Sequence, residues 1–127
     1  MTDNITCTVI QGDQTHVSDL PGLRPLMNWL HRSPEIFEGS YVIDKVVGKA
    51  SAMLLTYGGA RKIHGKLMSR PADEFLTAHR IEHTYDVLTD YILNQDQSDM
   101  CPMEKRVKDL KEAEEAFAAL KPIFIKE

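Results

Sequence analysis

The stretch from residue 41 to residue 59, YVIDKVVGKASAMLLTYGG, constrains the fold of this chain more than any other part of the sequence. It opens with a short apolar run, Tyr41 to Ile43, which predicts a strand. A helix is predicted next because apolar residues recur at a 3.6-residue period up to the glycine pair. Glycine readily takes the left-handed conformation that closes a helix. The residues of this apolar stripe are Val46, Val47, Ala50, Met53, Leu54 and Tyr57.

The rest of the chain continues this alternation of strands and helices. Each predicted element is bounded by proline, glycine or short polar clusters, which are typical of turns. The expected order is a hairpin at residues 6–13 and 15–19, a helix from Leu23 to Leu30, the strand and helix above, a strand at 62–68, a helix from Pro71, a strand at 84–92, and a helix from Met103 to Phe124 with a break near 109–111. Such an order predicts an α/β sandwich in which helices cover a mixed sheet.

The composition is that of a single globular domain spanning residues 1–127. The chain has 127 residues, 43% hydrophobic and 27% charged, which suffices for one core without disulfide or metal staples. We find no internal repeat, low-complexity segment or interdomain linker. We therefore expect one site.

Charge and hydropathy exclude two classes of partner. A formal net charge of -4 and an isoelectric point near 5.7 argue against a general nucleic-acid binder, which needs clustered lysine and arginine. The N-terminal MTDNITCTVI lacks the features of a signal peptide, and no window approaches the roughly 20 apolar residues that span a membrane. We predict a cytoplasmic protein.

The two cysteines, Cys7 and Cys101, lie far apart and belong to no CxxC or finger-like pattern. A structural zinc site is therefore not predicted, and we expect neither a metal ion nor a cofactor. In a reducing compartment both should be free thiols. Cys7, inside a predicted strand, is expected to pack in the core, and the five scattered histidines are interpreted as surface or packing residues.

The first candidate for chemistry is the stretch MCPMEKRV at residues 100–107. If Pro102 is the first helical residue, Cys101 is the N-cap and Glu104 the third helical residue, the geometry of a capping box with sulfur in place of a hydroxyl. The field of a helix N-terminus favours a thiolate, which suits a nucleophile. An ionised Glu104 opposes this, whereas a neutral one serves proton transfer. The alternative is a small buried Cys101 beside an ordinary capping glutamate.

The second candidate is DKVVGKA at residues 44–50. Asp44 and Lys45 follow a strand, and ligands of open α/β sheets gather at the carboxyl ends of strands. Lys45 and Lys49 are four apart and are predicted to share a helix face, while Gly48 permits a close approach by a ligand or another backbone. The two lysines would then hold an anion. The alternative is that Asp44 caps the helix and both lysines are solvated.

Together with GLRPLM near the front, DKVVGKASAMLL and MCPMEKRV resemble a bacterial and archaeal family, domain of unknown function 1893. Its members are similar in fold to cytidine deaminases, and the resemblance runs from Thr6 to Phe124. It implies a three-layer α/β/α sandwich, with a mixed five-stranded sheet and helices on both faces.

In deaminases of that fold, a His or Cys with a catalytic Glu opens one helix and a PCxxC pair opens the next, together holding zinc. Here only one thiol, Cys101, stands where three ligands are needed, so hydrolytic zinc deamination is not expected. The resemblance still implies that two helix N-termini meet in space. It thus brings Cys101 and Glu104 near Asp44, Lys45 and Lys49.

Two hypotheses about function follow. In the first, Cys101 is the nucleophile of an enzyme acting on a small anionic or nucleotide-like molecule, with Glu104, Lys49 and Asp44 as the other catalytic candidates. In the second, Lys45, Gly48 and Lys49 bind such a ligand without catalysis, and the protein senses or assembles. Deaminase-like domains often assemble, so the resemblance also allows a homodimer.

Overall fold

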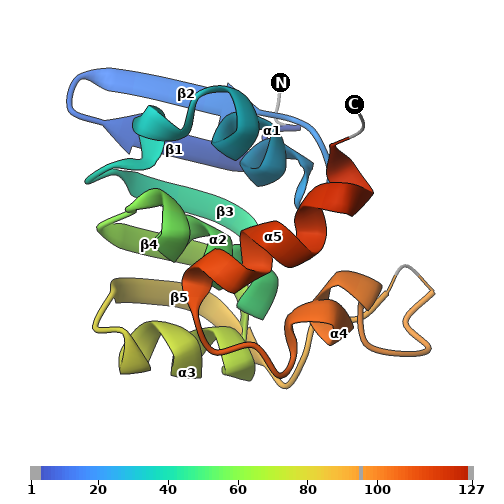
Figure 1. Cartoon of the computed structure of the whole chain (residues 1–127). Coiled ribbons are helices and arrows are strands. Elements are labelled where there is room, and N and C mark those ends of the chain that lie inside the picture. The colour runs from blue at the N-terminus through green and yellow to red at the C-terminus, as the bar shows by residue number, and fades with distance from the viewer. Residues whose placement is uncertain (1–3, 95, 126–127) are drawn as a thin grey trace.

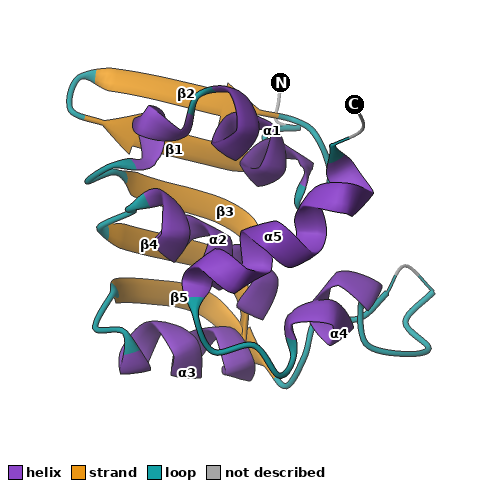
Figure 2. Ribbon diagram, in the orientation of Figure 1, coloured by secondary structure: helices purple, strands orange, loops and turns teal. Residues whose placement is uncertain are grey.

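The computed structural model describes residues 4–94 and 96–125. Its five strands form one mixed sheet in the order β2-β1-β3-β4-β5 (Figures 1 and 2). β1 runs antiparallel to β2 and β3, and β3, β4 and β5 are parallel. This confirms the α/β class and the predicted hairpin. The strands are β1 Cys7–Gln11, β2 Gln14–Ser18, β3 Tyr41–Val47, β4 Lys62–Ser69 and β5 Glu82–Thr89.

The helices agree with the apolar stripes read from the sequence. They are α1 Arg24–Arg32, a 3₁₀ helix Pro34–Phe37, α2 Lys49–Gly58, α3 Arg70–Ala78, α4 Pro102–Val107 and α5 Ala113–Phe124. The predicted break between the last two helices is confirmed, as is the end of α2. Gly59 adopts a φ of 96° there and its N–H bonds the last turn, which glycine does without strain.

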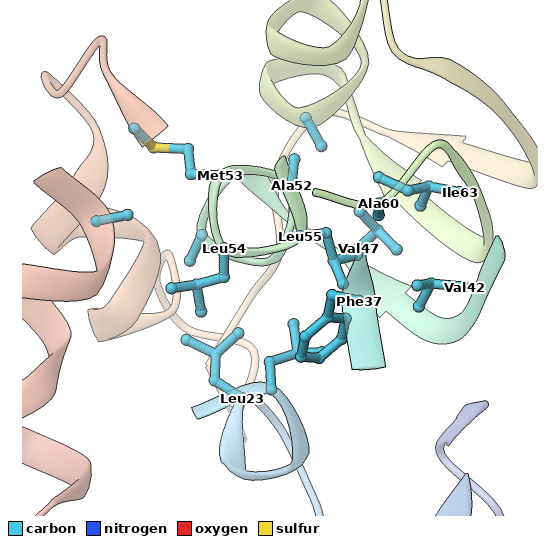
Figure 3. Close-up of a cluster of buried hydrophobic side chains, with 14 of the residues drawn as sticks. Leu23, Phe37, Val42, Val47, Ala52, Met53, Leu54, Leu55, Ala60 and Ile63 are labelled. Carbon is cyan, nitrogen blue, oxygen red and sulfur yellow. The ribbon is translucent and has the colours of Figure 1, made fainter. Parts of the chain in front are cut away.

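α2 is the central helix of the domain. It contacts α1, α3, α4 and α5, and its residues from Ala50 to Leu55 are all buried, as expected for a helix surrounded by other elements. In Figure 3, α2 is seen end-on, with Leu54 pointing towards Leu23 and Leu55 towards Val47. The hydrophobic core therefore lies between the sheet and the helices around α2.

The expectation that helices cover both faces of the sheet is wrong for the part of the chain that the structure describes. β3-α2-β4 and β4-α3-β5 are consecutive parallel crossovers in one direction, and their right-handed sense places α2 and α3 on the same face. α1 and α5 pack on α2, so they lie on that face too (Figure 1). The side chains of the opposite face are half-buried or exposed, among them Thr8, Ile10, Ile43, His64, Lys66 and Asp86.

β3 is longer than predicted, and this changes the start of the next helix. Val46 and Val47 belong to the strand, where Val46 pairs with Leu67 of β4. α2 begins only at Lys49, with Gly48 as its N-cap. β-branched residues fit a strand, and the pairing of Val46 and Val47 with β4 outweighs the helical spacing. No helix among the described residues combines the length and apolar character that crossing a membrane requires.

Candidate functional site

A cavity of about 890 Å³ lies where the end of β3 and the start of α2 meet α1 and α4. All but one of the predicted site residues line it. Apolar side chains supply most of the remaining wall. The lining includes Asp44, Lys45, Gly48, Cys101 and Glu104 from the predicted set, and Leu23, Arg24, Ser51, Met103 and Phe124 besides.

Asp44 lies on the helix-facing side of β3 and is 6% exposed. Burial raises the pKa of its carboxyl group to about 7, and the N–H groups of Val46 and Lys45 oppose that rise only in part. A carboxyl group with this pKa is present in both its neutral and its ionised forms at neutral pH. Asp44 can therefore donate or accept a hydrogen bond in the cavity.

Cys7 is the Cα partner of Asp44 across β1 and β3. It is 1% exposed and belongs to the hydrophobic core, which confirms its predicted packing role. Burial first, and the charge of Asp44 second, raise the pKa of the Cys7 thiol far above its ordinary range. Cys7 is consequently an unreactive neighbour of the cavity.

Glu104 caps a different helix from the one predicted. Its Oε1 accepts a hydrogen bond of 2.7 Å from the N–H of Lys49, and its Oε2 accepts one of 3.1 Å from the N–H of Ala50. Both donors open α2, and N-terminal N–H groups of a helix lack partners within it. The predicted capping box within α4 is therefore wrong. The Cys101 side chain makes no capping bond either.

Burial raises the pKa of Glu104, and the N–H groups of Ala50 and Lys49, with the charge of Lys49, act in the opposite direction. Both carboxylate oxygens are already engaged in bonds to α2. The group is thus placed to join α4 to α2 rather than to move protons.

Gly48 is required by the same contact. A Cβ atom at this position would lie 2.5 Å from Cδ and from Oε2 of Glu104, closer than any carbon side chain allows. The close approach at Gly48 is made by a side chain, and not by the ligand or backbone that was predicted. The group that approaches is the Glu104 carboxylate.

Lys45 and Lys49 do not share a helix face, so that prediction is wrong. Lys45 is an exposed residue of β3, whereas Lys49 is the first residue of α2. The Nζ atom of Lys49 donates a hydrogen bond of 2.8 Å to the carbonyl oxygen of Lys108, beyond the end of α4. Lys49 lines a second cavity instead of the first. Nor does Asp44 cap α2, because it lies within β3.

Cys101 is the N-cap residue of α4, as predicted, and is half-buried. Its N–H donates to the carbonyl oxygen of Ile92 at 2.9 Å, and its own carbonyl accepts the N–H of Lys105 at 3.1 Å. These bonds fix the backbone of Cys101. Cys101 lines the first cavity together with Asp44 and Glu104.

The family model for the domain of unknown function DUF1893 matches residues 1–124 of this chain. The chain belongs to the DUF1893 family. A crystal structure of a DUF1893 family protein (TM1506) from Thermotoga maritima is similar to it, with a TM-score of 0.87 and 31% sequence identity. The match covers 95% of this chain and 82% of that chain. Among curated proteins, no sequence matches.

The side chains of this DUF1893 protein do not fit the zinc of a deaminase. Within residues 4–94 and 96–125, no three His, Cys, Asp or Glu side chains come together as metal ligands. Glu104 has both oxygens bonded to α2, and Cys101 is the one thiol at the cavity. A deaminase zinc site needs three ligands, so the described residues do not form that site.

Ser51 and Arg24 are members of the cavity that were given no role from the sequence of this DUF1893 protein alone. Ser51 is 4% exposed in the first turn of α2 and lines the cavity. The only feature of the sequence that could have indicated this role is a serine among the small apolar residues of KASAM. Arg24 is the first residue of α1 and lies in GLRPLM. This motif contributed to the family resemblance, but it contains no acidic residue that would mark Arg24 as part of a site. Its place at the cavity depends on tertiary packing.

Proposed function

We propose that this DUF1893 protein binds a small molecule in the cavity that Asp44 lines. The cavity, at about 890 Å³, has the size of a ligand pocket, and its mainly apolar wall with a few converging polar groups is the usual composition of one. The observation that carries the proposal is the buried carboxyl group of Asp44 with its pKa raised to about 7. Perturbed carboxyl groups in clefts are frequent at functional sites.

The chemistry of the wall favours a nucleotide-like ligand. A carboxyl group that is neutral or ionised at neutral pH can pair with a heterocycle edge that presents donors, acceptors or both. Lys45 and Arg24 line the same cavity, beside the acidic Asp96 and Glu104, and supply positive charge for an anionic group. Asp44 would recognise the heterocycle, and the two cations would hold the anion.

The proposal includes a cytidine deaminase-like fold for the domain, except for the helix layer on the second face of the sheet. The mixed sheet in the order β2-β1-β3-β4-β5 supports it, as does a cavity lined from the starts of α1 and α2. In this reading the deaminase pocket is kept without its zinc ligands.

The test is a ligand-observed NMR screen of nucleobases, nucleosides and nucleotides against the wild-type chain and Asp44→Asn. Asparagine preserves size but removes the titrating group. We expect at least one compound to bind the wild-type chain saturably. Its affinity for Asp44→Asn should be at least about tenfold lower, because one strong hydrogen bond is lost. Lys66→Ala, on the opposite face of the sheet, is the matched control. Absence of any saturable binder, or equal binding by Asp44→Asn, contradicts the proposal.

A second candidate function is nucleophilic catalysis by Cys101 in this cavity. It is favoured by the half-buried thiol and the protonatable Asp44 on one wall. The thiolate would form an S–C bond to an electrophilic carbon, the bond to the leaving group would break, and Asp44 would give that group its proton. A catalyst should keep binding but lose turnover in Cys101→Ala, whereas a binding protein should tolerate Cys101→Ser.

A further inference from the structure

A second cavity, of about 930 Å³, lies between α3, the end of α4, and residues 91, 93 and 98–100. Glu104 and Leu93 line both cavities. The second one contains neither Asp44 nor Cys101 in its lining. The function proposed above makes no use of it.

Three lysines line this cavity, namely Lys49, Lys108 and Lys111. Lys49 is held in place because its Nζ donates to the Lys108 carbonyl oxygen at 2.8 Å. An ammonium group has three donors, so two remain for a ligand. Lys108 and Lys111 are exposed, and neither forms a salt bridge within the described residues.

One of the three acidic side chains in the wall is already paired with a cation. Asp99 pairs with Lys105, which is outside the cavity. Both oxygens of Glu104 accept N–H groups of α2. These neutral N–H groups leave the charge of Glu104 in place, so Glu74 and Glu104 stand against the three ammonium groups. The cavity therefore carries net positive charge, which attracts an anion.

An aromatic surface lies in the same wall. The rings of Phe75 and His79 stack with centroids 4.0 Å apart and planes 27° apart. His79 is held there because its Nδ1 donates to the Phe75 carbonyl oxygen at 3.0 Å. Leu93, Met100 and Leu110 add apolar area. A ring or other flat apolar group would pack against this surface.

We propose that the second cavity binds a small phosphate monoester with an aromatic body. The phosphate would lie against Lys49, Lys108 and Lys111, because a phosphate monoester carries nearly two negative charges at neutral pH and accepts charge-assisted hydrogen bonds. The aromatic body would pack beside Phe75 and His79. This site makes no use of Asp44 or Cys101, which line the first cavity alone.

The test uses phenyl phosphate as the probe, titrated into the ¹⁵N-labelled full chain and followed by NMR. We expect saturable shifts at Tyr91, His79 and Lys108, and no saturation with phenol, which lacks the phosphate. In the double variant Lys108→Ala/Lys111→Ala, both at exposed positions, the dissociation constant should rise at least about tenfold. Lys66→Ala, a lysine of the open sheet face, should bind as the wild type does.

Three outcomes would overturn the proposal. They are the absence of saturable phenyl phosphate binding, an equal weakening in Lys66→Ala, and shifts confined to the first cavity. Asp44→Asn separates the two sites. It should lose ligands of the first cavity and keep phenyl phosphate in the second.

Discussion

A Cβ atom at position 48 would lie 2.5 Å from Cδ of Glu104. The Glu104 carboxylate therefore fills the space that a side chain at position 48 would need. The carboxylate lies there because it bonds the N–H groups of Lys49 and Ala50. α4 thus supplies the N-terminal cap of α2, and the wall of the first cavity depends on this joint. The two helices cannot separate without exposing two unpaired N–H groups.

Gly48→Ala should destabilise the protein by about 2–4 kcal/mol, because the methyl group displaces the Glu104 carboxylate and leaves the α2 donors unpaired. The backbone of Gly48 has a φ of -92°, which alanine adopts easily, so the cost arises from the contact alone. Urea denaturation measures it. In a Glu104→Ala background the same substitution should cost much less, and an undiminished cost would contradict the contact as its cause.

The order of elements was predictable from the sequence because each apolar stripe and each turn signal is local. The boundary between β3 and α2 was not, because Val46 and Val47 satisfy both the helical period and a strand. Pairing with β4 decides between the two. A single sequence does not contain that information.

The candidate site was predictable in part. The meeting of MCPMEKRV with DKVVGKA is confirmed by bonds between Glu104 and the start of α2. The exact role of Glu104 was missed, because a capping box is recognised within one helix and this cap comes from a helix 55 residues away. The pairing of Lys45 with Lys49 failed for a simpler reason, since it assumed one continuous helix.

The two cysteines should differ strongly in alkylation. Cys101 is half-buried at the cavity, whereas Cys7 is 1% exposed with its pKa raised by burial. Mass spectrometry after iodoacetamide treatment of the folded protein should show Cys101 modified at least about a hundredfold faster than Cys7. Cys101→Ser should take up no label until unfolded. Comparable labelling of both residues would show that Cys7 is accessible.

The pH profile of this alkylation also tests the catalytic candidate. Reaction of Cys101 that remains fast well below about pH 8 would indicate an activated thiol. A profile like that of a simple thiol would remove the main support for catalysis and leave ligand binding as the function.

His83→Ala should reduce stability by about 1–2 kcal/mol. The Nε2 atom of His83 lies 2.7 Å from Oδ1 of Asp73 in α3, and its Nδ1 lies 2.7 Å from the Ile81 carbonyl oxygen. The ring contacts both partners and so joins β5 to α3. A double-mutant cycle with Asp73→Ala should show a coupling of at least about 0.5 kcal/mol. Additive losses would mean that the pair contributes nothing beyond packing.

Asp44 should make the protein less stable as pH rises. Its pKa is about 7 in the folded chain against an ordinary value of 3.8, so between these values the folded state binds the proton that the unfolded state has lost. Stability is greatest below this window and falls by up to about 1.4 kcal/mol per pH unit within it. Asp44→Asn should therefore gain stability relative to the wild type between pH 4 and 7, by a few kcal/mol in total.

The measurement for Asp44 is urea denaturation of both proteins at pH values across that window. Glu104, whose pKa is also raised, contributes equally to both and cancels in the difference. Asp109→Asn, at an exposed position, is the matched control and should follow the wild-type profile. If the difference between Asp44→Asn and the wild type does not change with pH, the carboxyl group of Asp44 ionises as it does in the unfolded chain. The small-molecule proposal would then lose the observation that carries it.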